Sequence, residues 1–179
     1  MSRFRSLCAA AALTTLTTVA AGAQSTIPPL ETSATAGEKA IVKHVVEDSV
    51  GDVQLGQLGL KMAHAAADRT LAAAMAKDHT RTAEAAMPVA ERLGADAKLE
   101  PDTSNQVDLS HLARYRGAQF DQEYLKTLID AHKTDIAGID AALEFTTDPG
   151  LRTLLRTVRS IDRSHLALAT SAQRSIGGQ

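Results

Sequence analysis

Residues 118–165 read AQFDQEYLKTLIDAHKTDIAGIDAALEFTTDPGLRTLLRTVRSIDRSH, and this stretch decides the fold. On both sides of the Thr-Thr-Asp-Pro break, apolar residues recur at the three- and four-residue spacing of an amphipathic helix. Asp148 is a favourable N-cap, and Pro149 suits the first position of a helix. The stretch therefore predicts a helical hairpin, with helices over about 118–145 and 149–176.

The sequence before this hairpin predicts a second one. Thr35 and Glu38 have the spacing of a capping box, which predicts that a first helix begins at residue 36 and runs to about residue 67. Asp68 is then expected to be the N-cap of a second helix over about 69–93.

The second helix has a clear end and a break in its middle. Gly94 is expected to terminate it as a C-terminal glycine, and Pro88 predicts a kink because proline removes one helical N–H. Polar residues 95–108 form the one long connection. Two hairpins joined by a longer crossover between helices two and three predict an all-α four-helix bundle over residues 36–176.

Residues 1–23 have the pattern of a secretory signal peptide. Two arginines precede an apolar run at 7–21, and Ala-Gly-Ala at 21–23 matches a cleavage site. Residues 24–35 are then a flexible lead-in to the bundle at 36–176. We expect a periplasmic or secreted protein, with association at the outer membrane left open; an uncleaved anchor is the alternative.

Composition excludes several classes of protein. With 44% hydrophobic and only 3% aromatic residues, the 179-residue chain favours a single helical domain over a disordered chain or a β-sandwich. The predicted signal peptide holds the single cysteine, which excludes thiolate chemistry from the remainder. It also holds two of the 19 basic and none of the 21 acidic residues, so a charge of −4 remains. Such a chain is a poor nucleic-acid binder, and no later apolar run is long enough to cross a membrane.

The candidates for chemistry are histidines on three different helices. His132 and His165 fall near the middle of the apolar faces of the third and fourth predicted helices, and His79 lies on the apolar face of the second. Counted along the helices from their expected caps, the three lie at similar heights. Asp52 on the first helix falls within several ångström of the same layer, although that helix is apolar on two sides.

Three imidazoles and one carboxylate suit a borderline divalent cation such as Zn, Cu or Fe. His79, His132, His165 and Asp52 are therefore the predicted metal ligands. The alternative is a set of core histidines that are hydrogen-bonded without any metal.

Neighbouring carboxylates are expected to orient the imidazoles. Asp135 lies one turn after His132 and Asp162 one turn before His165, so each could accept a hydrogen bond from a histidine. Asp78 is expected to point round its helix, away from the layer.

The fourth predicted helix also carries a basic stripe. It consists of Arg152, Arg156, Arg159 and Arg163. These side chains could contact an anionic partner such as lipid head groups or a cell-envelope polymer. The favoured interpretation is that they pair with acidic residues of a neighbouring helix.

Four short motifs together resemble one known family. They are GDVQLGQL at 51–58, AKDHT at 76–80, GAQFDQEYL at 117–125 and SHL at 164–166. On these motifs the chain resembles the bacterial secreted family named domain of unknown function 4142, over residues 40–172. The resemblance implies a ferritin-like four-helix bundle in the periplasm or at the outer membrane, and it implies no established activity.

Two functions remain open at this point. The first is a metal-binding or metal-buffering bundle. The second is a non-catalytic cell-envelope protein with structural histidines, which acts on another envelope protein or on an anionic envelope surface. We expect no enzyme, because the chain lacks the Glu-x-x-His motifs of di-iron oxidases, a Gly-rich phosphate loop and a serine nucleophile elbow.

Overall fold

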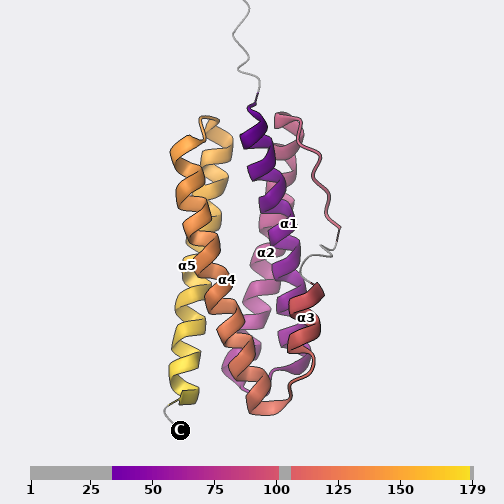
Figure 1. Cartoon of the computed structure of the whole chain (residues 1–179), viewed down its shortest axis with the longest axis vertical. Coiled ribbons are helices and arrows are strands. Elements are labelled where there is room, and N and C mark those ends of the chain that lie inside the picture. Colours follow the sequence, from indigo (N-terminus) through magenta and orange to yellow (C-terminus); the bar gives the residue numbers. More distant parts are fainter. Residues whose placement is uncertain (1–33, 101–105, 178–179) are drawn as a thin grey trace, which may run out of the picture. The chain divides into compact units, whose positions relative to one another are not determined.

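A computed structural model describes residues 34–100 and 106–177, and within these residues all regular elements are helices. The predicted signal peptide and nearly all of the lead-in lie outside the described residues. Four long helices and one short one follow each other along the chain (Figure 1). They are α1 (Ala36–Met62), α2 (Ala66–Leu93), α3 (Gln106–Leu112), α4 (Gly117–Phe145) and α5 (Pro149–Gly177).

The predicted pair of hairpins is confirmed. α1 packs along α2, and α4 packs along α5 (Figure 1). α2 and α5 join the two hairpins, whereas α1 and α4 meet much less closely. α3 lies in the crossover between α2 and α4, where Leu112 is fully buried and Leu109 packs against the core. The all-α bundle with one longer crossover is therefore correct, and the crossover carries a short helix of its own.

The core of the bundle consists of two apolar clusters rather than one. The first surrounds Met75, Phe120 and Tyr124. The second surrounds Val46 and Leu155. On every long helix, the residues that separate the two clusters include a buried polar side chain. These side chains are Asp52, His79, His132, Asp162 and His165. A polar layer thus divides the apolar interior.

The first hairpin turns earlier than the sequence predicts. α1 ends at Met62, and Ala65 is the N-cap of α2. The prediction that Asp68 caps α2 is therefore wrong. Instead, the carboxylate of Asp121 on α4 accepts hydrogen bonds from the backbone amides of His64 and Ala65, at 2.8 and 2.9 Å. Among the described residues no side chain caps α2, and the carboxylate of Asp121 holds the two residues that precede the helix.

Other end signals act as the sequence predicts. The side chain of Thr35 and that of Glu38 form the capping box of α1. Gly94 ends α2 in the left-handed conformation, with a φ of 67°, which glycine adopts without steric cost. Asp148 caps α5, because its Oδ1 accepts from the amide of Leu151 at 2.7 Å. α2 continues through Pro88.

One buried carboxylate joins the start of α1 to the turn between α4 and α5. Oε1 of Glu38 accepts from the backbone amides of Thr147 and Asp148 at 2.8 and 2.9 Å, while Oε2 accepts from the amide of Thr35. These backbone hydrogen bonds hold the pKa of Glu38 down to about 2. A charged Glu38 therefore stabilises the contact between the two hairpins at this end of the bundle.

The close contact of α1 with α2 depends on a glycine, and a second glycine provides the control. A Cβ at Gly56 would lie 2.7 Å from the backbone nitrogen of Ala76 and 2.8 Å from the carbonyl oxygen of Ala72, whereas one at Gly138 meets nothing within 4 Å. We expect Gly56→Ala to lower the free energy of unfolding by about 1–3 kcal/mol through overpacking. Gly138→Ala should raise it by about 1 kcal/mol through helix propensity. Urea denaturation measures both, and equal effects would contradict the close approach.

The stabilisation that charged Glu38 provides should depend on pH, and a neutral replacement tests this. Glu38→Gln should lower the free energy of unfolding by about 1–2 kcal/mol at pH 7, because the charge-assisted hydrogen bonds weaken. The wild-type advantage is complete above the ordinary pKa of 4.5 and is lost as the pH falls from 4.5 toward 2. Glu47→Gln is the control, since Glu47 makes only an exposed ion pair with Lys43. A difference between wild type and Glu38→Gln that stays constant from pH 7 to pH 3 would contradict this assignment.

Candidate metal centre

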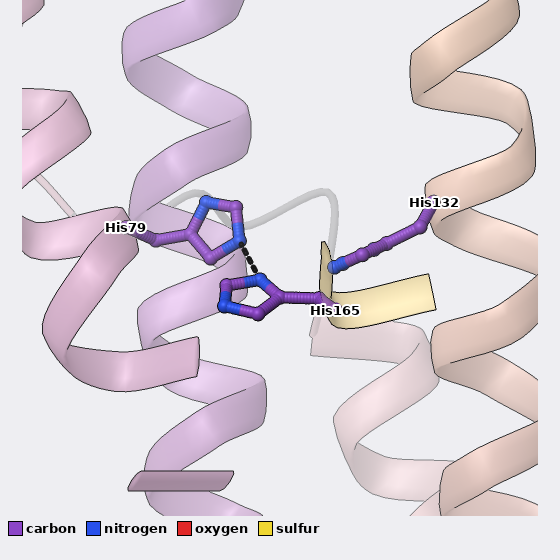
Figure 2. A group of neighbouring side chains, drawn as sticks. All are labelled: His79, His132 and His165. Carbon is purple, nitrogen blue, oxygen red and sulfur yellow. Dashed lines mark hydrogen bonds between the residues drawn. The ribbon is translucent and has the colours of Figure 1, made fainter. Parts of the chain in front are cut away.

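The polar layer brings three imidazoles together from three helices. His79 comes from α2, His132 from α4 and His165 from α5, and each side chain is buried (Figure 2). The sequence-based expectation that they converge agrees with their positions. Asp52 on α1 is buried in the same layer and is 5% exposed.

The spacing of the rings suits a small cation. Ring centroids lie 5.1 to 5.7 Å apart, and each ring offers one nitrogen within 4.8 Å of the others. Nδ1 of His165 lies 3.3 Å from Nε2 of His79, the dashed contact in Figure 2. Metal–nitrogen bonds of about 2.0–2.1 Å at a tetrahedral angle separate two ligand nitrogens by about 3.3 Å. These two histidines are therefore already at ligand spacing.

One ring nitrogen of each imidazole faces a carboxylate. The three contacts are His79 Nδ1 to Asp52 Oδ2 at 3.4 Å, His165 Nε2 to Asp78 Oδ2 at 3.3 Å, and His132 Nδ1 to Asp135 Oδ2 at 3.8 Å. Metal-binding histidines commonly carry a carboxylate on the nitrogen that does not bind the metal. The arrangement leaves Nε2 of His79 and Nδ1 of His165 directed at each other.

The structure changes the roles expected for some of these aspartates. Asp52 lies beside His79 and is grouped with His132 and Asp135, not with the three-histidine set. The prediction that Asp78 points away from the layer is wrong, because its carboxylate reaches His165 on the neighbouring helix.

Asp162 also differs from its expected role. Between Asp162 and His165, both of which the structure describes, there is no hydrogen bond. Asp162 is buried, and burial together with the charge of Asp48 raises its pKa to about 7. The charged group that shifts the pKa of Asp162 is therefore a carboxylate, and the imidazole of its own helix is not among the causes.

The histidines are held in the neutral form. Burial, with the neighbouring imidazoles adding to it, lowers the pKa of His79 to about 2 and that of His132 to about 4. Burial also lowers the pKa of His165, against the opposing effect of Asp78. Neutral imidazole is the form that binds a metal, so at neutral pH no proton has to leave the ring nitrogens that would bind.

The carboxylates show the opposite shift. Burial raises the pKa of Asp52 well above its ordinary value, and Asp48, Asp135 and Asp162 raise it further. The pKa of Asp135 rises to about 8 through burial and the same kind of neighbour. Each charged group that shifts these two pKa values is another carboxylate. These carboxylates must bind protons or a cation to be stable in the interior.

Hydrogen bonding does not compensate for the burial of His132. Its side chain is fully buried, and neither ring nitrogen has a hydrogen-bond partner among the described residues. A buried polar atom without a partner costs about 1–3 kcal/mol. By contrast, among the same described residues His79 leaves only Nδ1 without a partner, and both nitrogens of His165 have one.

The basic stripe on α5 is largely used within the molecule. Arg152 donates to the carbonyl oxygens of Leu143 and Thr146 at the end of α4, at 2.6 and 2.7 Å. Arg159 and Arg163 pair with Asp140 on α4. The favoured interpretation, pairing with a neighbouring helix, is confirmed for these two arginines.

The sequence of the chain matches a known family. The family described as domain of unknown function (DUF4142) matches residues 17–172. The chain belongs to this family. The resemblance found in the four sequence motifs is thereby confirmed for this DUF4142 chain.

Structural comparison places the DUF4142 chain near another helical domain. It resembles the crystal structure of a DUF305 fragment from Deinococcus radiodurans, with a TM-score of 0.68 and 17% sequence identity. The likeness covers 82% of this chain and 99% of the fragment, and it shows a shared fold. No curated protein matches the sequence. None of the helices that the structure describes is long and apolar enough to span a membrane.

The unpartnered state of His132 has a measurable consequence for the DUF4142 chain. With a chelator present, His132→Leu should raise the free energy of unfolding by about 1–3 kcal/mol, because an apolar side chain of similar size replaces two unsatisfied nitrogens. His79→Leu is the matched control: it removes one unpartnered nitrogen but leaves Nδ1 of His165 without its contact, so no net gain is expected. Urea denaturation measures both. A large loss of stability in His132→Leu would mean that His132 is hydrogen-bonded in the metal-free core.

Proposed function

We propose that this protein is an exported, non-catalytic bundle that binds and buffers one divalent transition-metal ion in its polar layer. His79, His132 and His165 are the ligands. The observation that carries the proposal is His132, a fully buried imidazole with two unpartnered nitrogens beside two other imidazoles at ligand spacing. A cation at the centre of the three rings would satisfy a nitrogen that the protein leaves without a partner.

The donor set favours a borderline cation. Three neutral imidazoles suit Zn, Cu or Fe, whereas Mg and Ca prefer oxygen ligands. Nε2 of His79 and Nδ1 of His165 face each other and would bind the ion. Asp52 and Asp78 would then fix the orientation of these two rings from behind. A water molecule would complete the coordination.

The surroundings of the site favour retention of an ion over turnover of a substrate. Apolar clusters lie on both sides of the layer, and all three imidazoles are almost fully removed from solvent. A catalytic metal needs an open position that a substrate can reach. Export rests on the signal-peptide pattern at residues 1–23, and it places the protein in the periplasm or outside the cell, with the outer membrane as a further location.

A second candidate function has its own observation in support. The contact between His79 and His165, and that between His165 and Asp78, satisfy both nitrogens of His165 and one nitrogen of His79 without any metal. On this basis the layer would be structural, and the protein would act through its surface on an envelope protein or an anionic envelope surface. The internal use of Arg152, Arg159 and Arg163 weakens the anionic-surface version of this candidate.

Thermal melting with and without metal distinguishes the two candidates. The purified protein is melted in chelator and then with Zn²⁺, Cu²⁺ or Fe²⁺. An ion that binds only the folded state, at 100 times its dissociation constant, adds about 2.7 kcal/mol. For a domain of this size that is a rise in Tm of several degrees.

Variants then assign any rise to the layer. His79→Ala, His132→Ala and His165→Ala should each abolish it, while their melting in chelator shows that they still fold. His44→Ala is the control, because His44 is exposed on α1. No rise with any of the three ions, or a rise that survives in the three variants, would overturn the proposal.

A further inference from the structure

A second group of metal-binding atoms lies beside the three imidazoles. Asp52, His132 and Asp135 each offer one ligand atom, and these atoms lie within 4.8 Å of one another. The group shares His132 with the three-histidine set but is otherwise composed of carboxylates. It comes from α1 and α4, which pack against each other less closely than α1 with α2, α4 with α5 or α2 with α5.

A cavity between α1 and α4 leads to the carboxylates. It is lined by Asp48, Asp52, Asp130 and Asp135, with His111 of α3 also in its wall. None of the three core imidazoles lines it. An ion that arrives from solvent through this cavity therefore meets the carboxylates before the histidines.

The charge of the cavity favours a cation. Its lining includes four aspartates and neither lysine nor arginine. The aspartates range from exposed Asp130 through partly exposed Asp135 to buried Asp52. A cleft lined by one sign of charge raises the local concentration of counter-ions and speeds their association.

His132 makes this more than a cluster of acidic side chains. Its imidazole is fully buried, has no hydrogen-bond partner in the described part of the chain, and directs Nδ1 at Asp135 over 3.8 Å. Two carboxylate oxygens and one nitrogen form a harder ligand set than three imidazoles. A borderline ion would bind the carboxylate group more weakly and the three histidines more tightly.

We propose that Asp52, His132 and Asp135 form an outer cation position, which a divalent metal ion occupies on its way from the α1–α4 cavity to the three-histidine position. This inference rests on the proposed metal-binding function. A neutral imidazole has one free lone pair, so His132 serves one position at a time. The protein therefore binds one ion per chain. That ion moves inward when His132 stops binding it at the outer position and binds it at the three-histidine position.

The kinetics of Co²⁺ uptake test the outer position, with Co²⁺ absorbance reporting nitrogen coordination. Stopped-flow mixing compares the wild type with Asp135→Asn and with the matched control Asp130→Asn. Asn keeps an oxygen that can accept a hydrogen bond from His132, but it cannot ionise when a cation binds. Asp135→Asn should slow association by at least about tenfold and should slow dissociation as well, because the ion leaves through the same position, with the final spectrum unchanged. Asp130→Asn should change association much less, because Asp130 lines the cavity outside the ligand group.

A second measurement uses only the wild-type protein, so it does not depend on the folding of a variant. Association of Co²⁺ with the wild type should slow as ionic strength rises, since salt screens attraction by exposed and partly exposed carboxylates. Titration should saturate at one ion per chain. Salt-independent association, or two ions bound per chain, would overturn the outer position.

The remaining outcomes separate this inference from the proposed function. If the wild type binds Co²⁺ and Asp135→Asn binds it equally fast, the outer position is wrong and the three-histidine site stands. If Asp135→Asn releases the ion faster with unchanged association, Asp135 only positions His132, and the outer position is again wrong. If the wild type binds no Co²⁺, both proposals fail.

Discussion

The desolvation of one polar layer is the constraint on which the rest of this structure depends. Burying three imidazoles and their carboxylates between two apolar clusters costs free energy that an all-apolar bundle would not spend. The pKa shifts express this cost, because burial lowers those of the histidines and raises those of Asp52 and Asp135. Both shifts favour uncharged side chains in the metal-free protein. A bound cation would reverse the balance by allowing the carboxylates to ionise.

Hydrogen bonds at the two ends of the bundle hold the layer in register. Glu38 of α1 accepts backbone amides from the turn between α4 and α5. At the other end, Asp121 of α4 accepts the amides of His64 and Ala65 between α1 and α2. Each carboxylate therefore links one hairpin to the connection of the other. With both ends held, the hairpins have little freedom to slide, and the histidines of α2 and α5 stay level with His132 of α4.

Sequence reasoning succeeded where the information is local or periodic. The capping box at Thr35, the left-handed Gly94 and the Asp148–Pro149 start each act within a few residues. Helical periodicity and the distance along each helix axis were sufficient to predict that the three histidines lie in one layer. The same reasoning failed at Asp68, because α2 already begins at Ala66 and the amides just before it are bound by Asp121, more than 50 residues away. It failed at Asp78 because that carboxylate contacts the neighbouring helix rather than its own.

The helical class, the family, the two hairpins and the identity of the buried histidines could all be read from the sequence alone. These follow from caps, turn residues and apolar spacing, all of which act over short distances along the chain. Only the tertiary structure decided which nitrogen of each ring faces which aspartate, and that Asp52 stands with His132 and Asp135. Those contacts depend on how far each helix is rotated and shifted against its neighbours. Displacements of one or two ångström decide them, and no pattern within a single helix records such displacements.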